Sequence, residues 1–113
     1  MTSKRQVHRR SLSLAEFDEM IEDANVNAYG ESEETVGFFL VLEERLKLPF
    51  RTEVLGMDVI DERIDLTDDE QIVAVCTRGE SQQRVPILDL SLPNPPPEGA
   101  EWIEAFRRWA RSR

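Results

Sequence analysis

The sequence predicts an α+β fold, with an N-terminal helix-loop-helix, a small antiparallel SH3-like sheet or barrel and a C-terminal helix. Three observations support this prediction. Apolar residues recur at helical spacing up to Leu48, short β-rich runs follow Pro49, and an amphipathic stretch comes last. With 113 residues, 40% apolar and 33% charged, the chain has material for one modest core. We expect one single domain over residues 13–113, after a basic flexible arm over residues 1–12.

Two helices are expected in the N-terminal half. Ser13 and Glu16 have the spacing of a capping box, and the apolar residues that follow predict a helix over about residues 14–24. Turn-forming residues then separate this helix from a second one over residues 33–48, which has one broad apolar face and which Pro49 ends.

After Pro49 the sequence changes to short runs that we interpret as three or four antiparallel strands. The runs are Phe50 to Leu55, Met57 to Leu66, Gln71 to Thr77 and Arg84 to Leu92. Gly79 suits a tight hairpin between the last two runs. So few short strands are expected to close as a small curled sheet or an SH3-like barrel.

A proline-rich segment and an amphipathic helix complete the chain. Residues 93–97 read Pro-Asn-Pro-Pro-Pro, an extended connector of the polyproline type. Residues 98–111 place Trp102 and Trp109 on one side of the last predicted helix, and arginines gather at its C-terminal end, where the helix dipole favours cations.

The negative charge is concentrated in the body of the chain. All 23 Asp and Glu residues lie between Glu16 and Glu104, together with only six of the 14 basic residues up to Arg84, so this body has a net charge of −17. Such a surface repels nucleic acid and attracts cations, although it also serves solubility. Neither a membrane-spanning stretch nor a signal peptide is visible, so a cytoplasmic location is expected.

Residues suited to catalysis are scarce, and we expect no enzymatic activity. His8 is the only histidine and lies in the basic arm, so a serine or cysteine triad would lack a positioned base. The five glycines are scattered singly, without the phosphate-binding loop of nucleotide-binding proteins. Cys76 lies in an apolar run and is expected to be a small core residue.

The segment between the first two helices has the composition of a calcium loop. Calcium takes six to eight oxygen ligands, and a helix-to-helix loop of about twelve residues supplies them at alternating positions. If Asp23 is the first position of such a loop, every ligand position carries an oxygen donor. The candidate ligands are Asp23, Asn25, Asn27, the Tyr29 carbonyl, Glu31 and Glu34, with Glu33 next to the last of them. Ala28 stands where a standard loop has glycine. The alternative is that Ser32, Glu33 and Glu34 cap the second helix and Asn25 ends the first.

A second acidic segment is a weaker candidate cation site. Its proposed ligands are Asp61, Asp65, Asp68 and Asp69, with Asp58, Glu62 and Glu70 nearby. They are spread over a predicted strand and the turn that follows it. The alternative is that the charges alternating along the strand form its solvent face and that Asp68 and Asp69 are ordinary turn residues.

Several stretches together resemble the CcbP-type family of small bacterial calcium-binding proteins. They are Phe17 to Ile21, Ala28 to Glu34 with Gly37 and Phe38, Leu48 to Phe50, Ile72 to Cys76, Ile87 to Leu90 and Gly99 to Ala105. The resemblance implies an acidic cytoplasmic calcium buffer or signalling protein without a standard EF-hand. It also implies that the family's acidic loop falls on Asn27, Glu31, Glu33 and Glu34, with Asn27 where an aspartate is expected.

Two functional hypotheses therefore stand side by side. The first is a non-enzymatic protein that binds Ca²⁺ through one or both acidic segments. The second is a protein-protein interaction module without metal, in which the sheet, the polyproline connector and an exposed helix bearing Trp102 and Trp109 face an unidentified protein partner. A weaker idea is that the basic arms contact membranes or RNA.

Overall fold

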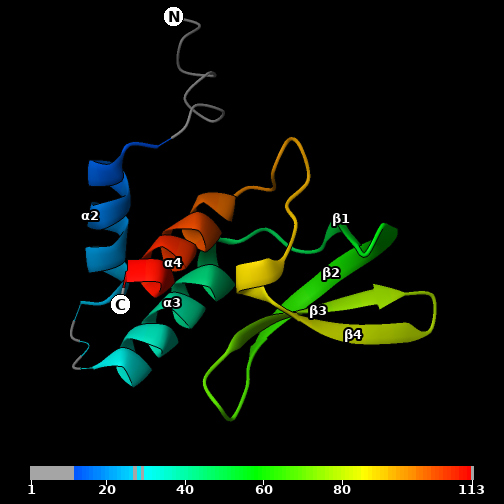
Figure 1. Ribbon diagram of the computed structural model, residues 1–113, viewed down its shortest axis with the longest axis horizontal. Helices are drawn as coiled ribbons and strands as arrows, with labels where there is room; N and C mark the ends of the chain where they lie inside the picture. Colours follow the sequence, from blue (N-terminus) through cyan, green and yellow to red (C-terminus); the bar gives the residue numbers. More distant parts are fainter. Residues whose placement is uncertain (1–11, 27, 29, 113) are drawn as a thin grey trace, which may run out of the picture.

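The structure, a computed structural model, describes residues 12–26, 28 and 30–112. Of the basic arm expected over residues 1–12, only Leu12 lies within the described residues. The elements in chain order are α2 (Leu14–Ala24), α3 (Glu31–Arg45), β1 (Phe50–Val54), β2 (Met57–Leu66), β3 (Ile72–Arg78), β4 (Ser81–Pro86), the 3₁₀ helix η1 (Ile87–Asp89) and α4 (Ala100–Ser112). The α+β class is confirmed, because the described residues form three α-helices beside one antiparallel sheet (Figure 1).

Helix α2 begins and ends where the sequence predicts. The Ser13 N–H donates to Glu16 Oε1 over 2.8 Å, and the Glu16 N–H donates to Ser13 Oγ over 3.1 Å, which completes the capping box. Its C-cap is Asn25. Helix α3 passes close to this end, because a Cβ on Gly37 would lie 2.3 Å from the Ala24 carbonyl oxygen. Glycine at position 37 is therefore what allows the two helices to approach here.

The prediction for α3 was wrong at both ends. The helix starts at Glu31, with Gly30 as its N-cap, and it ends at Arg45 rather than Leu48. The residue before a proline is sterically disfavoured in the helical region, so the chain leaves the helix before the Leu48-Pro49 bond.

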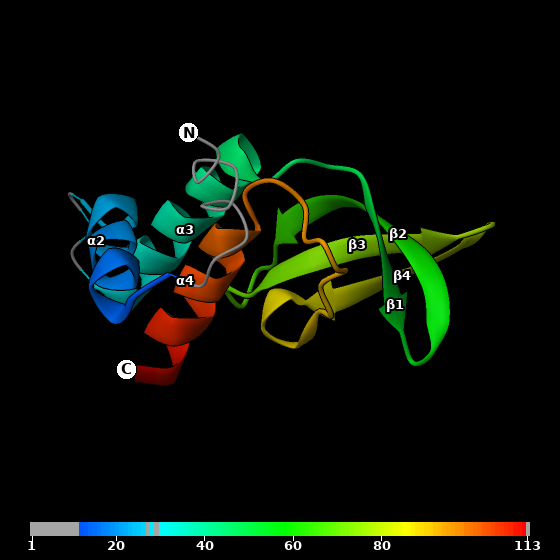
Figure 2. The same cartoon turned by 90° about the horizontal axis from the view of Figure 1, so that it is seen from above.

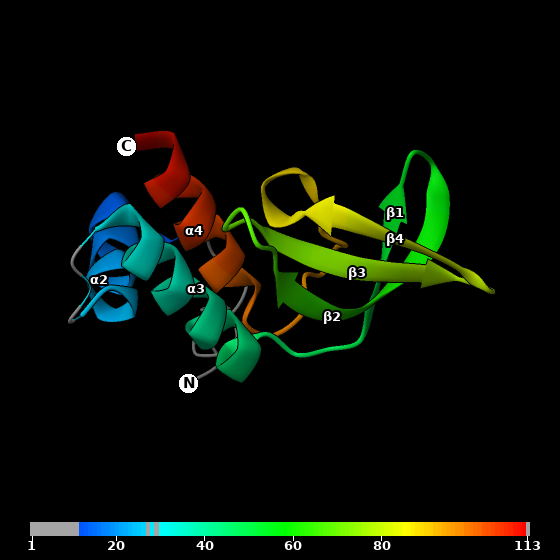
Figure 3. The ribbon, with the colours of Figure 1, turned by 90° about the horizontal axis from the view of Figure 1, so that it is seen from below.

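The sheet is an open meander in the order β1-β2-β3-β4, with every neighbouring pair antiparallel. Figures 2 and 3 show it as a strongly twisted layer beside the helices. Within the described residues no pairing joins β1 to β4, so the sheet does not close into a barrel. A register shift in β2 sets Asp61 against Cys76 and Arg63 against Val75, which makes Glu62 the extra residue of a β-bulge.

The strand predicted over residues 84–92 was also misplaced. Arg78 pairs with Ser81 across the Gly79 turn, so β4 starts at Ser81 and ends at Pro86, after which η1 begins. The chain then crosses the sheet's core face, where the Thr52 hydroxyl donates to the Ser91 carbonyl. The Arg107 guanidinium ties this segment to α4 by donating to the carbonyls of Ile87 and Leu90.

One hydrophobic core joins helices and sheet. Phe38 of α3 packs against Phe106 and Trp109 of α4, with ring centroids 5.3 and 5.4 Å away. The expectation of an exposed tryptophan surface on α4 was wrong, because Trp109 is buried and Trp102 is half-buried against the core. Cys76 is buried as predicted. Burial raises its thiol pKa to about 11, with the Asp61 charge adding to the effect.

Candidate functional site

The predicted calcium loop is described only in part. Asp23 is exposed in the last turn of α2, and Asn25 ends that helix, its N–H donating to the carbonyls of Ile21 and Glu22. The Asn25 Oδ1 atom is buried without a hydrogen-bond partner. Asn27 and Tyr29 lie outside the described residues.

The acidic residues that follow the loop form the first turn of α3. Glu31 and Glu33 are exposed and Glu34 is half-buried. Carboxylates in a first helical turn are favoured by the helix dipole, so part of their role is to stabilise α3. Ser32 lies inside the helix rather than at its cap, and its hydroxyl donates to Glu70 Oε2 over 2.7 Å.

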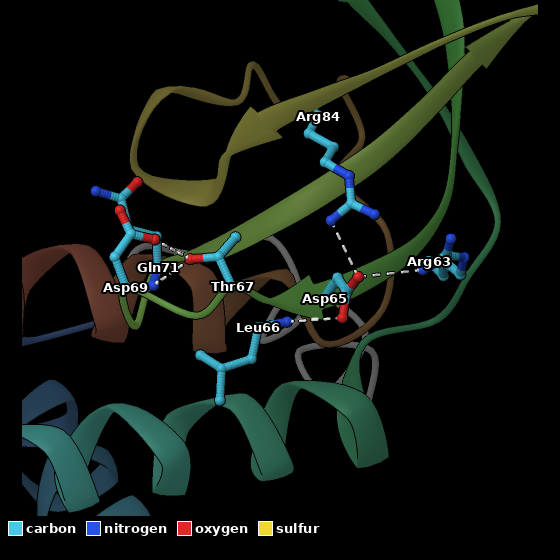
Figure 4. Close-up of polar contacts among 7 residues, drawn as sticks. All are labelled: Arg63, Asp65, Leu66, Thr67, Asp69, Gln71 and Arg84. Carbon is cyan, nitrogen blue, oxygen red and sulfur yellow. Dashed lines mark hydrogen bonds and ion pairs between the residues drawn. The ribbon is translucent and has the colours of Figure 1, made fainter.

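The carboxylates of the second segment lie in three separate places. Asp68 and Asp69 are exposed in the turn between β2 and β3, where the Thr67 hydroxyl donates to Asp69 Oδ1. Asp65 lies on the sheet face that carries Arg63 and Arg84, and Figure 4 shows both arginines pointing to its carboxylate, with nitrogen-oxygen distances of 3.6 and 3.1 Å.

The ionised carboxylate of Asp65 is thus already paired with two arginines. The Leu66 N–H donates to Asp65 Oδ1 over 2.9 Å, and this bond, followed by the Arg84 and Arg63 contacts, holds the pKa of Asp65 below its ordinary value (Figure 4). A carboxylate engaged by two guanidinium groups is a poor candidate for a cation ligand.

Asp61 is neither a solvent-facing residue nor an accessible ligand. Its side chain is 0% exposed on the core face of β2, and neither carboxylate oxygen has a hydrogen-bond partner. Burial raises the pKa of Asp61 to about 7. The Arg63 amide lowers it in part, although its N–H does not reach hydrogen-bond geometry, and the Glu62 charge raises it further.

The structure nevertheless joins the two acidic segments at one cleft. A cleft of about 210 Å³ lies between the start of α3, the β2-β3 turn, the end of β4 with η1, and α4. Its oxygen-bearing wall is made by Glu31, Thr35, Asp69, Glu70 and Gln71, and its apolar wall by Ile72, Pro86, Leu88 and Phe106. Among the residues that the structure describes, none that lines the cleft is basic. The hydrogen bond from Ser32 to Glu70 links the two acidic segments.

The cleft includes residues that the sequence did not single out as ligands. Glu70 has a left-handed backbone, with φ 66°, and its N–H donates to the Thr67 carbonyl over 2.9 Å. Gln71 donates its N–H to the Thr67 hydroxyl over 3.0 Å (Figure 4). The Thr35 hydroxyl donates to the Glu31 carbonyl over 3.0 Å. The sequence from Thr67 onward predicts a tight turn. It does not predict that this turn lies beside α3, because the two segments are far apart in the chain.

No group of three or more His, Cys, Asp or Glu side chains is gathered closely enough to hold a metal ion among the residues described. The donor set of the cleft is nonetheless oxygen-only, the type that calcium takes. Cation binding there would require Glu31, Asp69 and Glu70 to draw in around the ion.

Comparisons with known proteins found no match among protein-family models, curated proteins or solved structures. The similarity to the CcbP-type family therefore stays a prediction. In the part of the chain that the structure describes, no helix is both long enough and apolar enough to cross a bilayer.

Proposed function

We propose that this protein binds Ca²⁺, without enzymatic activity, at the acidic cleft between α3 and the β2-β3 turn. The observation that carries the proposal is that Glu31, Asp69 and Glu70, from two segments far apart in the sequence, line one cleft together. A divalent cation would offset the repulsion that arises as these carboxylates draw together, and the amide of Gln71 and the hydroxyl of Thr35 are additional oxygen donors.

The other ligands predicted from the sequence are not all part of the proposed site. Asp23, Asn25, Asn27 and Tyr29 precede Glu31 in the sequence, and Asp68 precedes Asp69. Asp61 and Asp65 are left out, because one is enclosed in the core and the other is bound by arginines. The net charge of −9 supports cation attraction over the surface as a whole. A cytoplasmic calcium buffer or signalling role is the proposed setting.

Thermal unfolding with calcium, magnesium and chelator tests the proposal. A ligand that binds only the folded state stabilises it by mass action, by about 2.7 kcal/mol at one hundred times its Kd. Millimolar calcium is expected to raise the melting temperature of chelator-treated protein, and equal concentrations of magnesium are expected to raise it less. An unchanged melting temperature in millimolar calcium would exclude calcium binding at a useful affinity.

A second candidate function rests on the apolar wall of the same cleft. Leu88 is 47% exposed beside Ile72, Pro86 and Phe106, under an acidic rim. That combination suits a protein partner that presents an apolar and a basic side chain together. The test is to screen a library of peptides that contain such pairs for binding in the presence of chelator. Binding that the Leu88→Ala variant loses would favour this interaction module over the calcium site.

A further inference from the structure

The buried carboxylate of Asp61 has a role that the calcium proposal does not use. Asp61 is completely enclosed, and both of its oxygens lack a partner. An ionised carboxylate in such a place loses its hydration without gaining compensating bonds, so the folded form favours the protonated acid. An unsatisfied buried acid of this kind makes the packing around it sensitive to protons.

Among the described residues, no positively charged side chain contributes to the pKa shift of Asp61. Its register partners are Phe50 on β1, which is apolar, and Cys76 on β3, whose thiol stays neutral because its pKa is raised. On its own strand, the neighbouring Glu62 repels the ionised form. On the segment that covers the core face, Asp89 is exposed and the Arg107 guanidinium is held by backbone carbonyls.

Strand β1 is the element that can most readily release this carboxylate. It is a short edge strand, Phe50–Val54, whose ladder pairs it with β2 alone, whereas β2 and β3 are paired on both sides. Its additional tie to the covering segment is the bond from the Thr52 hydroxyl to the Ser91 carbonyl. The bulge at Glu62 interrupts the β2-β3 ladder next to Asp61. Edge strands with few partners open at lower free energy than central ones.

We propose that Asp61 acts as a proton-controlled latch, whose protonated form keeps β1 closed over the core and whose ionisation favours release of β1 from β2. The carboxylate gives its proton to solvent and becomes hydrated in the open form. The water that hydrates Asp61 in the open form also reaches its register partner on β3, the Cys76 thiol. The latch responds to pH through the sheet and is independent of the acidic cleft.

Cys76 is the only cysteine, so its reaction with a dipyridyl disulfide reports the opening. The rate is normalised to that of the same thiol in urea-unfolded protein at each pH, which removes the intrinsic pH dependence of thiolate formation. Because ionisation drives opening, the normalised rate of wild type is expected to rise up to about tenfold per pH unit from about pH 5 and to level off above about pH 7. A rate that is flat over this range would overturn the proposal.

Two variants and one control locate the effect. Asp61→Asn, which cannot ionise, is expected to give a flat profile, while Asp58→Asn, an exposed carboxylate on the same strand, keeps the wild-type slope. Thr52→Val, which lacks the bond to Ser91, is expected to react faster at every pH with the slope unchanged. If β1 is released locally, without global unfolding, the rate of Cys76 modification is expected to depend only weakly on the urea concentration. A urea dependence equal to that of global unfolding would overturn the role of β1.

Discussion

Replacing Asp61 by Asn is expected to remove a large pH dependence from the global stability of the fold. The native pKa of Asp61 is raised from 3.8 to about 7, so the native state holds the proton more tightly than the unfolded chain does. Its stabilising contribution is complete below about pH 4 and is lost as the pH rises toward 7. At about 1.36 kcal/mol per pKa unit, the three-unit shift corresponds to about 4 kcal/mol at most.

The assay is urea unfolding of wild type and Asp61→Asn followed by tryptophan fluorescence, since Trp109 is buried in the native state. The free energy of unfolding of the variant minus that of wild type is expected to grow by about 2.5 kcal/mol between about pH 5 and pH 8. Other titrating groups contribute equally to both proteins and cancel in the difference. Asp58→Asn, the exposed control on β2, is expected to give a difference that does not change with pH. A constant difference for Asp61→Asn would refute the reasoning that the buried acid is protonated in the native state.

The remaining predictions concern local packing. Gly99→Ala is expected to lower the free energy of unfolding in urea by about 3 kcal/mol or more, because its Cβ would lie 2.0 Å from the Arg45 carbonyl oxygen. The control is Gly79→Ala, where φ is similarly positive but the space is open, and it is expected to lower the free energy of unfolding by only about 1 kcal/mol. Equal losses of stability in the two variants would show that the backbone conformation, rather than the steric contact, determines the cost of the added Cβ. Arg107→Lys is expected to lose about 1–3 kcal/mol, because an ammonium group cannot reproduce the forked bonds to η1, and an unchanged midpoint would contradict this. Ser13→Ala is expected to lose about 1 kcal/mol of helix capping, seen as a lower thermal midpoint.

Elements specified by local sequence were predictable. The capping box and the apolar spacing located α2, and the Gly79 hairpin followed from a glycine between two strand-like runs. The first half of β4 was missed because Ser81 and its polar neighbours form an exposed edge, so pairing with β3 rather than composition makes them a strand. The predicted continuation to Leu92 failed because the chain turns into η1 at Ile87 and crosses to the core.

The misjudged placement of Asp61 has a physical cause in the bulge. Strict alternation through Ile60, Ile64 and Leu66 places Asp61 on the solvent face. The extra residue Glu62 shifts the phase, so Val59 and Asp61 face the core together with Ile64. A bulge leaves little trace in one sequence, and the burial of Asp61 therefore could not be predicted.

The candidate site was predictable in composition but not in assembly. The acidic character of Glu31 and of the Asp68-Asp69 turn was evident, and the oxygen chemistry of calcium followed from it. The grouping of Glu31 with Glu70 depends on α3 docking beside the β2-β3 turn, a contact between residues far apart in the chain. The arginines that occupy Asp65 come from β2 and β4, and only the sheet register brings them together.

Calorimetric titration of calcium into chelator-treated protein, with two double variants of equal charge, decides whether the cleft between α3 and the β2-β3 turn binds calcium. Glu31→Gln with Glu70→Gln removes two carboxylates from the cleft, while Glu43→Gln with Glu44→Gln removes two exposed ones near the far end of α3. Wild type and the α3-end variant are expected to bind calcium saturably, and the cleft variant is expected to bind it at least about tenfold more weakly, equivalent to about 1.4 kcal/mol. Equal weakening in both variants, or no saturable heat from wild type, would contradict a calcium site at the cleft.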